Sequence, residues 1–500
     1  MEKTETTKRP WDLETDILVA GCGYAGTAAA VFAHDAGAKV LLLEKMPNPG
    51  GLSILAGGFA TICEDANEAF IYLKHSCGGR TPDDVLRAYA EGMTWLPDLY
   101  RELVKVDRAE VIEKRRKGAT YPLPGRETFG EIYITAIPDF KGFPWGKGMR
   151  GGARLFKVLH DNLSARKITV NCGSPVTRLL TNGAGEVIGV EARQSGKTIS
   201  IKAKRGVILA TGGFEYDQDF KDQFVQAKPL YSLYRGNTAD GIRMAQKVGA
   251  KLWHMWHIHA GYGFKYDDFP IAFRTMISGT RKPDQIMPWI LLDKQGRRFM
   301  NEYPPAIQDT GIRAIEYFDA DTQDYPRIPC YLIFDHKGLG LGQLGFCPIN
   351  DPEASYSWSE DNSAELERGW IKRAETISEV SKILGLTAEA VEESVKRWNH
   401  MCANREDSDF GRLPGTMMPI KEPPFYGMQA WPIVTNTQGG PEHNALQQVI
   451  NIDGDPIPRL YALGELGSLF GHLYLEAGNI SECFIGARIA AKHAWTQGAW

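Results

Sequence analysis

The residues with the clearest chemical potential form a glycine cluster near the N-terminus, GCGYAG at residues 21–26. In this spacing Gly21 permits a tight turn, Gly23 lets the main chain approach a pyrophosphate, and Gly26 lets a helix pack closely on a strand. Glu44 follows Gly21 by roughly 20 residues, where a carboxylate can accept hydrogen bonds from an adenosine ribose. These residues predict a site for an ADP-containing cofactor; an ordinary glycine turn and a solvated glutamate are the alternatives.

The elements that must position these residues lie on either side of the cluster. Residues 17–20 (ILVA) form a short apolar run typical of a buried parallel strand, and the alanine-rich segment after the cluster has helical character. A second apolar run, residues 40–43, ends directly before Glu44. A strand, a glycine turn and a helix in this order aim the helix N-terminus at the phosphates. The sequence therefore predicts an α/β fold that begins with a nucleotide-binding unit.

A second glycine cluster, PNPGGLSILAGG, follows at residues 47–58. Its glycines flank Ser53 and offer backbone without side chains, where a bulky ring system or a phosphate can lie against the main chain. A nicotinamide-binding fold needs no such cluster. Glu44-Lys45 followed by GGxSxxxGG resembles the flavin-binding segment of the fumarate reductase and succinate dehydrogenase flavoprotein superfamily, which also contains the 3-ketosteroid dehydrogenases.

Two later stretches carry the same resemblance: KRGVILATGGF at residues 204–214, and LYALGELGSLFGHLY at residues 460–474. The resemblance implies FAD as the cofactor. It also implies a Rossmann-like FAD-binding domain of the glutathione-reductase type, with an inserted α+β capping domain that closes over the flavin. We expect residues 1–224 and 427–500 to form the two parts of the FAD-binding domain, and residues 225–426 to form the capping and substrate domain.

The FAD site that the resemblance implies combines the glycine clusters with the later strand ends. Asn479 and Ile480 are expected at a helix mouth, where main-chain N–H groups can meet a flavin carbonyl and the helix dipole stabilises negative charge on the reduced ring. The residues assigned to this site are Gly21, Gly23, Tyr24, Ala25, Gly26, Glu44, Lys45, Gly50, Gly51, Ser53, Ala56, Gly57, Gly58, Val176, Ala210, Thr211, Gly212, Asp240, Gly464, Glu465, Asn479 and Ile480.

The composition narrows the classes of partner. The net charge of −4 gives no basic footprint, so we expect no nucleic-acid partner. The 8 cysteines are scattered without metal-ligand spacing, which predicts reduced thiols and no metal site. The polar N-terminus predicts no secretory signal, and no apolar run reaches the length of a membrane span. We therefore expect a cytoplasmic protein.

The resemblance also separates two kinds of chemistry. In the carboxylate reductases an arginine acid lies a few residues beyond an RFxNE motif, and RRFMNE at residues 297–302 leads to Ala306 at that position. Asn436 stands where those reductases carry a substrate-binding histidine, and Leu475 stands where they carry a second arginine. A fumarate-like reaction is therefore disfavoured and remains the second hypothesis.

The segment HLYLEAG resembles the ketosteroid dehydrogenases more closely. Tyr474 matches the phenol that binds the ketone oxygen there, and Gly478 matches the glycine whose N–H does the same. Tyr121, in YPLPG, matches a third tyrosine of that family more loosely. The general-base tyrosine of the family would fall at Ala306, so Tyr303 is the substitute candidate.

These residue types suit hydrogen removal from a CH–CH group beside a ketone, or the reverse reduction of an enone. The proton next to the ketone becomes acidic only if positioned donors hold the growing enolate oxygen, and a tyrosinate could be the base if its pKa falls from about 10. We expect a hydrophobic, cyclic substrate such as a 3-ketosteroid. A flavin-carrying electron-transfer subunit without catalysis is the third hypothesis.

Several conspicuous side chains have less specific interpretations. His254, His257 and His259 do not have the spacing of a preorganised metal triad, so core or cleft-lining positions are favoured for them. Trp253, Trp256 and Trp289 are candidates for an apolar substrate cleft or for the core of the capping domain. No second nucleotide fingerprint is visible, so direct use of NAD(P)H is not supported and the electron partner is unknown.

Overall fold

Strands from both ends of the chain form the first sheet of the computed structural model, which describes residues 11–147, 150–275, 284–304, 309, 311–347 and 350–500. The eight-stranded sheet has the order β20-β21-β9-β1-β2-β6, with β8 paired to β9 and β7 to β8. The strands are β1 (Leu13–Ala20), β2 (Val40–Leu43), β6 (Thr169–Asn171), β7 (Val176–Thr181), β8 (Val187–Gln194), β9 (Lys197–Leu209), β20 (Gln448–Ile450) and β21 (Pro456–Ala462).

The centre of this sheet is parallel, and its strands are buried toward their carboxyl ends. β1 pairs with β2 on one side and with β9 on the other, and β21 pairs with β9, all in parallel. The predicted apolar runs at residues 17–20 and 40–43 lie in β1 and β2. Because helices cover both faces of such a sheet, its strands need continuous apolar sequence and show no alternation.

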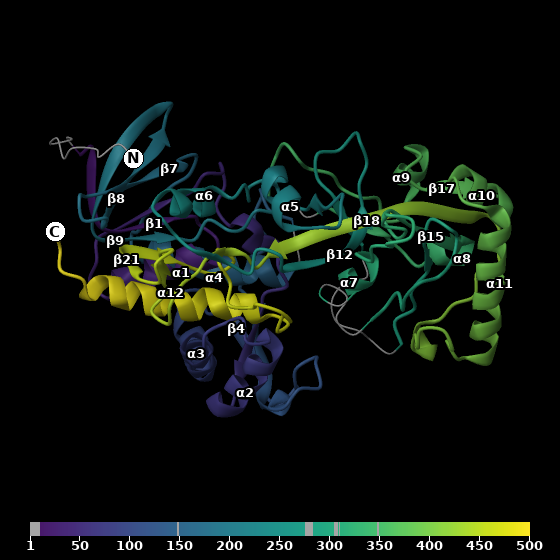
Figure 1. Ribbon diagram of the computed structural model, residues 1–500, viewed down its shortest axis with the longest axis horizontal. Helices are drawn as coiled ribbons and strands as arrows, with labels where there is room; N and C mark the ends of the chain where they lie inside the picture. Colours follow the sequence, from purple (N-terminus) through teal and green to yellow (C-terminus); the bar gives the residue numbers. More distant parts are fainter. Residues whose placement is uncertain (1–10, 148–149, 276–283, 305–308, 310, 348–349) are drawn as a thin grey trace.

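Two helices rich in small residues pack against each other under this sheet. Helix α1 (Tyr24–Asp35) and helix α12 (Gly478–Thr496) run side by side, and both carry buried alanines along most of their length. The small side chains allow the two backbones to approach closely, which brings the C-terminal segment onto the first glycine turn (Figure 1). Helices α4 (Arg150–Ala165) and α6 (Asp240–Lys247) complete this lobe.

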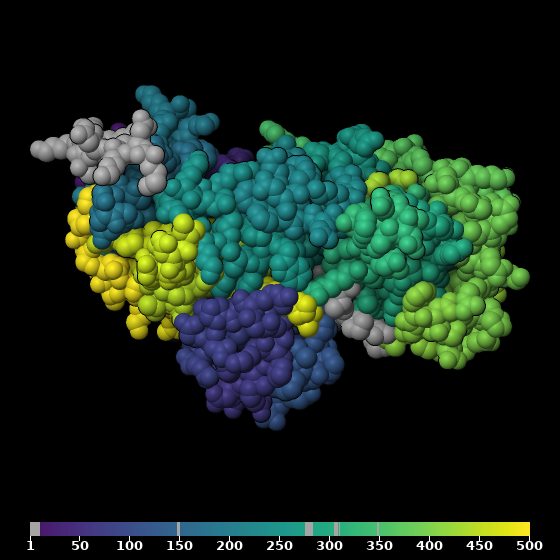
Figure 2. Space-filling model, viewed as in Figure 1, coloured from purple at the N-terminus to yellow at the C-terminus, as the bar shows by residue number. Residues whose placement is uncertain are grey.

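A smaller unit projects from this first lobe beside its junction with the second (Figure 2). It contains an antiparallel sheet in the order β3-β5-β4 and two helices. The elements of this unit are β3 (Phe59–Cys63), β4 (Glu110–Lys114), β5 (Phe129–Ala136), α2 (Ala66–Cys77) and α3 (Asp83–Leu103). The loop between β4 and β5 contains Tyr121, as its two prolines predict.

A second eight-stranded sheet forms the other lobe, and its long strand β18 (Phe425–Thr437) extends from that lobe to the first (Figure 1). Its order is β14-β15-β18-β12-β13-β16, with β10 and β17 also paired to β18. The other strands are β10 (Tyr231–Ser232), β12 (Ile258–Phe264), β13 (Phe273–Thr275), β14 (Ile290–Leu292), β15 (Cys330–Asp335), β16 (Gly345–Phe346) and β17 (Lys372–Ala374). The boundary predicted at 426/427 therefore falls inside a strand.

Short helices and one long helix border the second sheet. They are α5 (Gln218–Phe224), α7 (Ile312–Ile315), α8 (His336–Leu339), α9 (Ser363–Glu367), α10 (Ile377–Ile383) and α11 (Ala388–Asn404). Thr376 and Glu379 form the predicted capping box at the start of α10. A two-stranded ribbon of β11 (Leu252–Trp253) and β19 (Gly440–Pro441) brings the chain back to the first lobe. The boundary predicted at 224/225 lies before α6, which packs on β7 of the first sheet.

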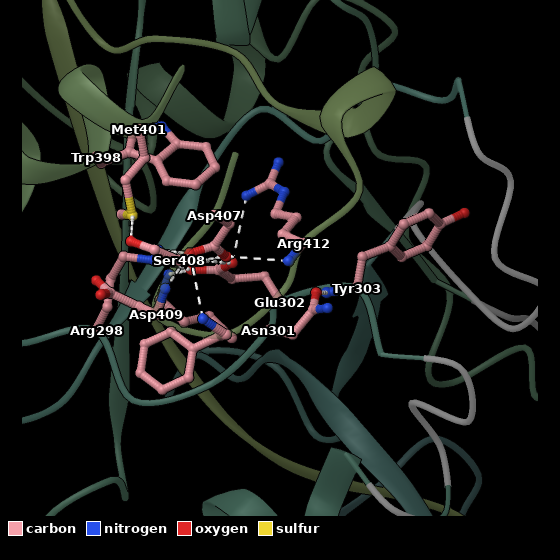
Figure 3. A network of polar contacts seen from close by, with 12 residues as sticks. Arg298, Asn301, Glu302, Tyr303, Trp398, Met401, Asp407, Ser408, Asp409 and Arg412 are labelled. Atoms are coloured by element: carbon pink, nitrogen blue, oxygen red, sulfur yellow. Dashed lines mark hydrogen bonds and ion pairs between the residues drawn. The ribbon is translucent and has the colours of Figure 1, made fainter. Parts of the chain in front are cut away.

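The RRFMNE motif builds the interior of the second lobe. Arg298 donates two hydrogen bonds of 2.8 Å to Glu302 and two of 3.0 and 3.2 Å to Asp407 (Figure 3). Arg412 donates to Glu302 at 3.4 Å and to three main-chain carbonyl oxygens, and the Trp398 ring lies under both guanidinium groups. All four charged side chains are buried. The RRFMNE residues that carry this part of the resemblance therefore stabilise the second lobe.

The described residues contain neither a membrane-spanning helix nor a group of metal-binding side chains. No helix among them is long and apolar enough to span a bilayer. Across the same ranges, no group of three or more histidine, cysteine, aspartate or glutamate side chains is arranged to hold a metal ion.

Candidate active site

A cavity opens at the carboxyl ends of β1, β2, β9 and β21, where open α/β sheets bind their ligands. It contacts the first glycine turn, the end of β2, the segment after β9 and the residues after β21. The predicted cofactor residues that line it are Gly21, Gly23, Tyr24, Ala25, Glu44, Lys45, Gly51, Ser53, Val176, Ala210, Thr211, Gly212, Asp240 and Glu465. Segments far apart in the sequence therefore converge on one site.

The first glycine turn is shaped by close main-chain contacts. Gly21 has φ of +101°, and a Cβ there would lie 2.2 Å from the carbonyl oxygen of Ala210. A Cβ at Gly26 would lie 1.9 Å from the carbonyl oxygen of Gly21, so no other residue allows α1 to sit this close to β1. The Tyr24 N–H donates to Ser53 Oγ at 3.0 Å, which links the two glycine clusters.

Glu44 lies at the end of β2 with both carboxylate oxygens engaged. Oε2 accepts the Cys22 N–H at 2.8 Å and Oε1 accepts the Met46 N–H at 2.8 Å. Burial raises the pKa of Glu44, although these two N–H groups and Lys45 oppose the rise. The main-chain bonds fix the carboxylate at the cavity wall, and the remaining lone pairs are available to ribose hydroxyls.

The residues present fit an ADP-containing group. Thr211 Oγ1 is buried, borders the cavity and has no hydrogen-bond partner among the described residues. Lys45 Nζ donates to Asp240 Oδ2 at 2.6 Å and to Thr238 Oγ1 at 2.7 Å at the same wall. An unsatisfied hydroxyl on the wall of a cavity that also contacts the glycine turn is what a bound phosphate or sugar would complete.

The other predicted cofactor residues do not line this cavity: Gly26, Gly50, Ala56, Gly57, Gly58, Gly464, Asn479 and Ile480. Gly58 packs against the start of α4, where its Cβ would lie 2.2 Å from the Gly151 main chain, and a Cβ at Gly152 would lie 2.2 Å from Ala56 O. Tyr24 Oη also donates to Gly152 O at 2.8 Å. The end of the second glycine cluster therefore packs its main chain against the main chain at the start of α4.

A buried pair of carboxylates adjoins the cavity, and one member was not predicted. Glu465 lines the cavity, and it and Glu215 both accept the Thr437 N–H, at 2.9 and 3.2 Å. Burial raises the pKa of Glu465 well above its ordinary value, and the neighbouring Glu215 carboxylate raises it further. The pair therefore holds a proton. Glu215 lies directly after ATGGF, but nothing in its local sequence distinguishes it from a surface residue.

The mouth of α12 contains a buried polar network around Asn479. Asn479 Nδ2 donates to Gln438 Oε1 at 3.0 Å, to Ser468 Oγ at 3.1 Å and to Glu482 Oε2 at 3.2 Å. Asn436 Nδ2 donates to Asn479 Oδ1 at 3.1 Å. This network fixes the first turn of α12, where the flavin carbonyl was predicted to bind.

Tyr474 lies next to this network. Its Oη accepts the Asn479 N–H at 3.4 Å, and its ring centroid is 4.3 Å from that of His259. No described residue accepts the proton of the Tyr474 hydroxyl. Burial raises the pKa of this phenol, so it stays protonated and is available as a hydrogen-bond donor.

Gly478, which was predicted to bind the ketone oxygen together with Tyr474, uses its N–H elsewhere. The Gly478 N–H donates to Leu475 O at 2.7 Å, so it is already used within the turn that starts α12. A Cβ at Gly478 would lie 2.4 Å from the Phe470 ring, which gives this glycine a packing reason. As the structure stands, the Tyr474 hydroxyl is available to a carbonyl oxygen and the Gly478 N–H is not.

Tyr121 meets a residue that sequence reasoning missed. Its Oη forms a short hydrogen bond to Asp309 Oδ2, and the same oxygen accepts the Tyr474 N–H at 3.0 Å. Arg313 donates to Asp309 Oδ1 at 3.2 Å, and His257 Nε2 lies 3.8 Å from that oxygen. Asp309 thus joins the two tyrosines. The motif count led to Ala306, which is outside the described residues, and no local signal marks the aspartate three positions later.

Tyr303 lies elsewhere in the second lobe. Its side chain points away from the Arg298–Glu302 network (Figure 3), and its Oη donates to Gln285 Oε1 at 3.3 Å. It is buried in the core that includes Trp289. No hydrogen bond links it to Tyr474, Tyr121 or Asp309 among the described residues.

The three histidines have separate partners. His254 Nδ1 is hydrogen-bonded to Ser468 O at 2.8 Å, and His257 Nδ1 is hydrogen-bonded to Phe470 O at 2.6 Å. His259 Nδ1 is hydrogen-bonded to Asn436 Oδ1 at 3.0 Å. Trp253 stacks on His254, whereas Trp289 is in the core of the second lobe. Trp256 is 44% exposed and lies near Arg80 and Arg313.

Comparison with known proteins agrees with this geometry. A family model described as an FAD binding domain matches residues 16–480. The urocanate reductase of Eggerthella lenta is 27% identical over 493 residues, covering 96% of this chain and 74% of the reductase. The 3-oxosteroid 1-dehydrogenase of Comamonas testosteroni is 25% identical over 557 residues, covering 93% of this chain and 94% of the dehydrogenase.

The fold of this chain also resembles that of a solved dehydrogenase. The structure of a 3-ketosteroid delta1-dehydrogenase from Sterolibacterium denitrificans has a TM-score of 0.81 at 22% identity and covers 96% of this chain and 99% of that chain. At this identity the likeness concerns the fold. The chain therefore belongs to the FAD binding domain family, and it is an FAD-dependent oxidoreductase of the fumarate reductase and ketosteroid dehydrogenase type, acting on C=C or CH–CH groups.

Proposed function

We propose that the chain transfers hydride between FAD and a carbon–carbon bond beside the carbonyl of a hydrophobic, cyclic substrate. The reaction is the reduction of an enone or, in reverse, the desaturation of a ketone. The observation that carries the proposal is the buried Tyr474 hydroxyl, whose proton has no acceptor among the described residues. A buried donor without an acceptor costs free energy unless a ligand completes it.

Tyr474 would hold the carbonyl oxygen of the substrate. As hydride enters the double bond, negative charge grows on that oxygen, and a donor already in place stabilises it without reorganisation. The raised pKa of Tyr474, caused by burial, keeps its proton on the phenol throughout. The Asn479 N–H donates a hydrogen bond to the Tyr474 hydroxyl oxygen and so helps to hold it in place.

The FAD would be held by the glycine turn, Glu44 and the mouth of α12, and when bound it supplies or accepts the hydride. The dipole of α12 adds partial positive charge at its N-terminus, which favours the anionic reduced form of a ring placed there. The predicted Gly478 donor would contribute only if the turn to Leu475 opens when substrate binds.

A second candidate, reduction of an unsaturated carboxylic acid, is favoured by Arg274. This arginine lies opposite Gly263 in the β12–β13 pair, and it forms no ion pair or hydrogen bond within the described residues. Burial lowers its pKa to about 10, with no carboxylate to oppose the change. Residues 276–283, which follow it, contain no aspartate or glutamate. A partly buried cation without a counter-ion among the described residues is suited to bind an acidic substrate group.

Arg274 also influences the side of the sheet that carries His259. Burial lowers the pKa of His259 to about 4, and the positive charge of Arg274 contributes to that fall. His259, Gly263 and the strand partner Arg274 share one face of the sheet, because residues two and four apart along β12 point the same way. A carboxylate bound by Arg274 would thus lie on the face that contacts Tyr474.

An anaerobic titration separates these candidates. The photoreduced protein is mixed with cyclic enones and with unsaturated acids, and the return of the oxidised flavin absorbance is followed. Reoxidation by enones alone supports the first candidate. Reoxidation by acids that is lost in Arg274→Gln and retained in part in Arg274→Lys supports the second. Reoxidation by neither class contradicts both.

A further inference from the structure

We propose that the buried pair His257–Asp309 delivers the proton that accompanies hydride transfer, so that the chain is equipped to work as a reductase. The inference rests on the proposed function, because it assumes hydride transfer to a polarised double bond near Tyr474. It assigns the acid that the RRFMNE motif left open at Ala306.

The hydrogen bonds of His257 determine where its proton lies. His257 Nδ1 is 2.6 Å from Phe470 O, and a carbonyl oxygen only accepts, so Nδ1 carries a hydrogen. His257 Nε2 is buried, has no hydrogen-bond partner among the described residues and faces Asp309 Oδ1 at 3.8 Å. If Nε2 were unprotonated, its lone pair would face a carboxylate. The geometry therefore favours the imidazolium form, with an Nε2–H that no described residue accepts at hydrogen-bond distance.

Asp309 is held in its ionised form. Burial would raise its pKa, but the nearby His257 ring, hydrogen bonds from Tyr121 and the Tyr474 N–H, and the positive charge of Arg313 hold the pKa below its ordinary value. The charge of Asp309 also reaches Tyr72 on α2, His259 on β12 and His472 in the loop before Tyr474. An aspartate that remains ionised cannot donate a proton near neutral pH, but it stabilises the charge on His257.

Asp309 places this pair beside the site of the carbonyl. One of its oxygens accepts both the Tyr121 hydroxyl and the Tyr474 N–H, so the group that keeps His257 charged also fixes the main chain of the proposed carbonyl-binding residue. Asp309 belongs to the second lobe, whereas Tyr121 and Tyr474 belong to the first. The proton donor is therefore assembled where the two lobes meet.

The proton step balances with the hydride that FAD supplies. One carbon of the double bond receives the hydride. The π electron pair forms the second C–H bond with the proton of Nε2, and the N–H electron pair stays on the imidazole. His257 is left neutral and takes a proton from water before the next turnover. The two electrons come from the reduced cofactor, so no further reductant is required.

The other titratable candidates are less suited to this step. The proton of Tyr121 is already held by Asp309, and burial together with that carboxylate raises the pKa of Tyr121, so it is a poor acid. Tyr303 donates to Gln285 in the second lobe. Arg313 shares its guanidinium between Asp309 and His472 O and so acts on the pair as a positioning residue.

The test compares two variants of the pair with a matched histidine. His257→Gln is expected to slow substrate reduction by at least about 100-fold, the usual contribution of a general acid, and to remove the alkaline limb of the kcat profile. Asp309→Asn is expected to move that limb to lower pH, because the imidazolium loses its counter-ion. His254→Gln is the control, since His254 is also buried and its ring nitrogens lie near the carbonyl oxygens of Ser468 and Arg80.

A second readout does not depend on turnover. Nitrogen-15 spectra of histidine-labelled protein, assigned with His257→Gln, are expected to show both ring nitrogens of His257 protonated near neutral pH, and only one in Asp309→Asn. A wild-type spectrum with neutral His257, or an unchanged rate and pH profile in His257→Gln, would overturn the proposal. Loss of hydride transfer in the wild-type protein would instead contradict the proposed function, so the two failures are distinguishable.

Discussion

At the scale of single residues, the site depends on groups whose protonation is set by burial. Tyr474 keeps its proton, Asp309 loses its proton, and the Glu215–Glu465 pair retains one between two carboxylates. Each of these states follows from a specific neighbour and from the low polarity of the surroundings. Substitutions that preserve shape and change charge therefore test this account most directly.

Glu482 provides a test through stability. Burial raises its pKa from 4.5 to about 7, against three hydrogen bonds that favour its anion. Because the pKa of Glu482 is higher in the folded than in the unfolded protein, its contribution to the free energy of unfolding is complete below pH 4.5. That contribution, about 3 kcal/mol, is lost as pH rises through about 7. In Glu482→Gln the decline of the free energy of unfolding across this range should be correspondingly smaller, as measured by urea titration. Parallel wild-type and variant curves would refute this assignment.

Glu44 tests the cofactor site. Glu44→Ala is expected to weaken FAD binding by about 10- to 100-fold, because hydrogen bonds to a charged group contribute about 1.5–3 kcal/mol. Fluorescence titration of flavin-free protein measures the change. Glu14→Ala is the control, since Glu14 lies at the exposed beginning of β1, away from the cavity, and forms an ion pair with Lys204. Equal affinities of the two variants would remove Glu44 from the site.

At the scale of elements, the two lobes are stabilised in different ways. The first depends on close backbone packing, as at Gly26 under β1 and Gly58 against α4. The second contains the buried ion network of Arg298, Glu302, Asp407 and Arg412. Such a network satisfies every charge internally, but it becomes costly when one member is removed.

That network leads to a prediction about folding. Glu302→Ala is expected to destabilise the protein by about 3–5 kcal/mol, because it leaves two buried guanidinium groups short of a partner. Urea unfolding measures the effect. The matched control is Glu393→Ala on α11, whose exposed pair with Lys396 should contribute less than about 1 kcal/mol. A Glu302→Ala protein as stable as the control would show that the network has no such weight.

The elements that sequence could predict are those with local causes. β1, α1 and β2 follow from apolar periodicity and the glycine turn, and the capping box at Thr376 follows from the spacing of two residues. The domain boundary predicted at 426/427 falls within β18, because the continuation of this strand across the two lobes depends on pairing with distant strands.

The candidate catalytic site was less predictable for a related reason. The position of Tyr474 could be found from the HLYLEAG segment, but the use of the Gly478 N–H within its own turn is a matter of main-chain geometry. Asp309 and Glu215 become functional candidates only through contacts with residues more than 150 positions away. Contacts of this kind leave no trace in residue spacing.

At the scale of the whole molecule, the two lobes meet at the proposed catalytic site. The first supplies the cavity for FAD, Tyr121 and Tyr474, and the second supplies Asp309. The contact between them places His257 and Asp309 next to Tyr474. A reductive reaction needs both groups at once, one for the carbonyl oxygen and one for the carbon that receives a proton.

The central claim is that Tyr474 polarises the substrate while FAD exchanges hydride with it. The most direct measurement is anaerobic single-turnover reoxidation of the photoreduced protein by a substrate identified in the titration above, comparing wild type with Tyr474→Phe. The account predicts equal flavin content and a reoxidation rate at least about 100-fold lower in Tyr474→Phe, the usual effect of removing one oxyanion donor. Equal rates in the two proteins, or a wild-type protein that takes up no flavin, would contradict it.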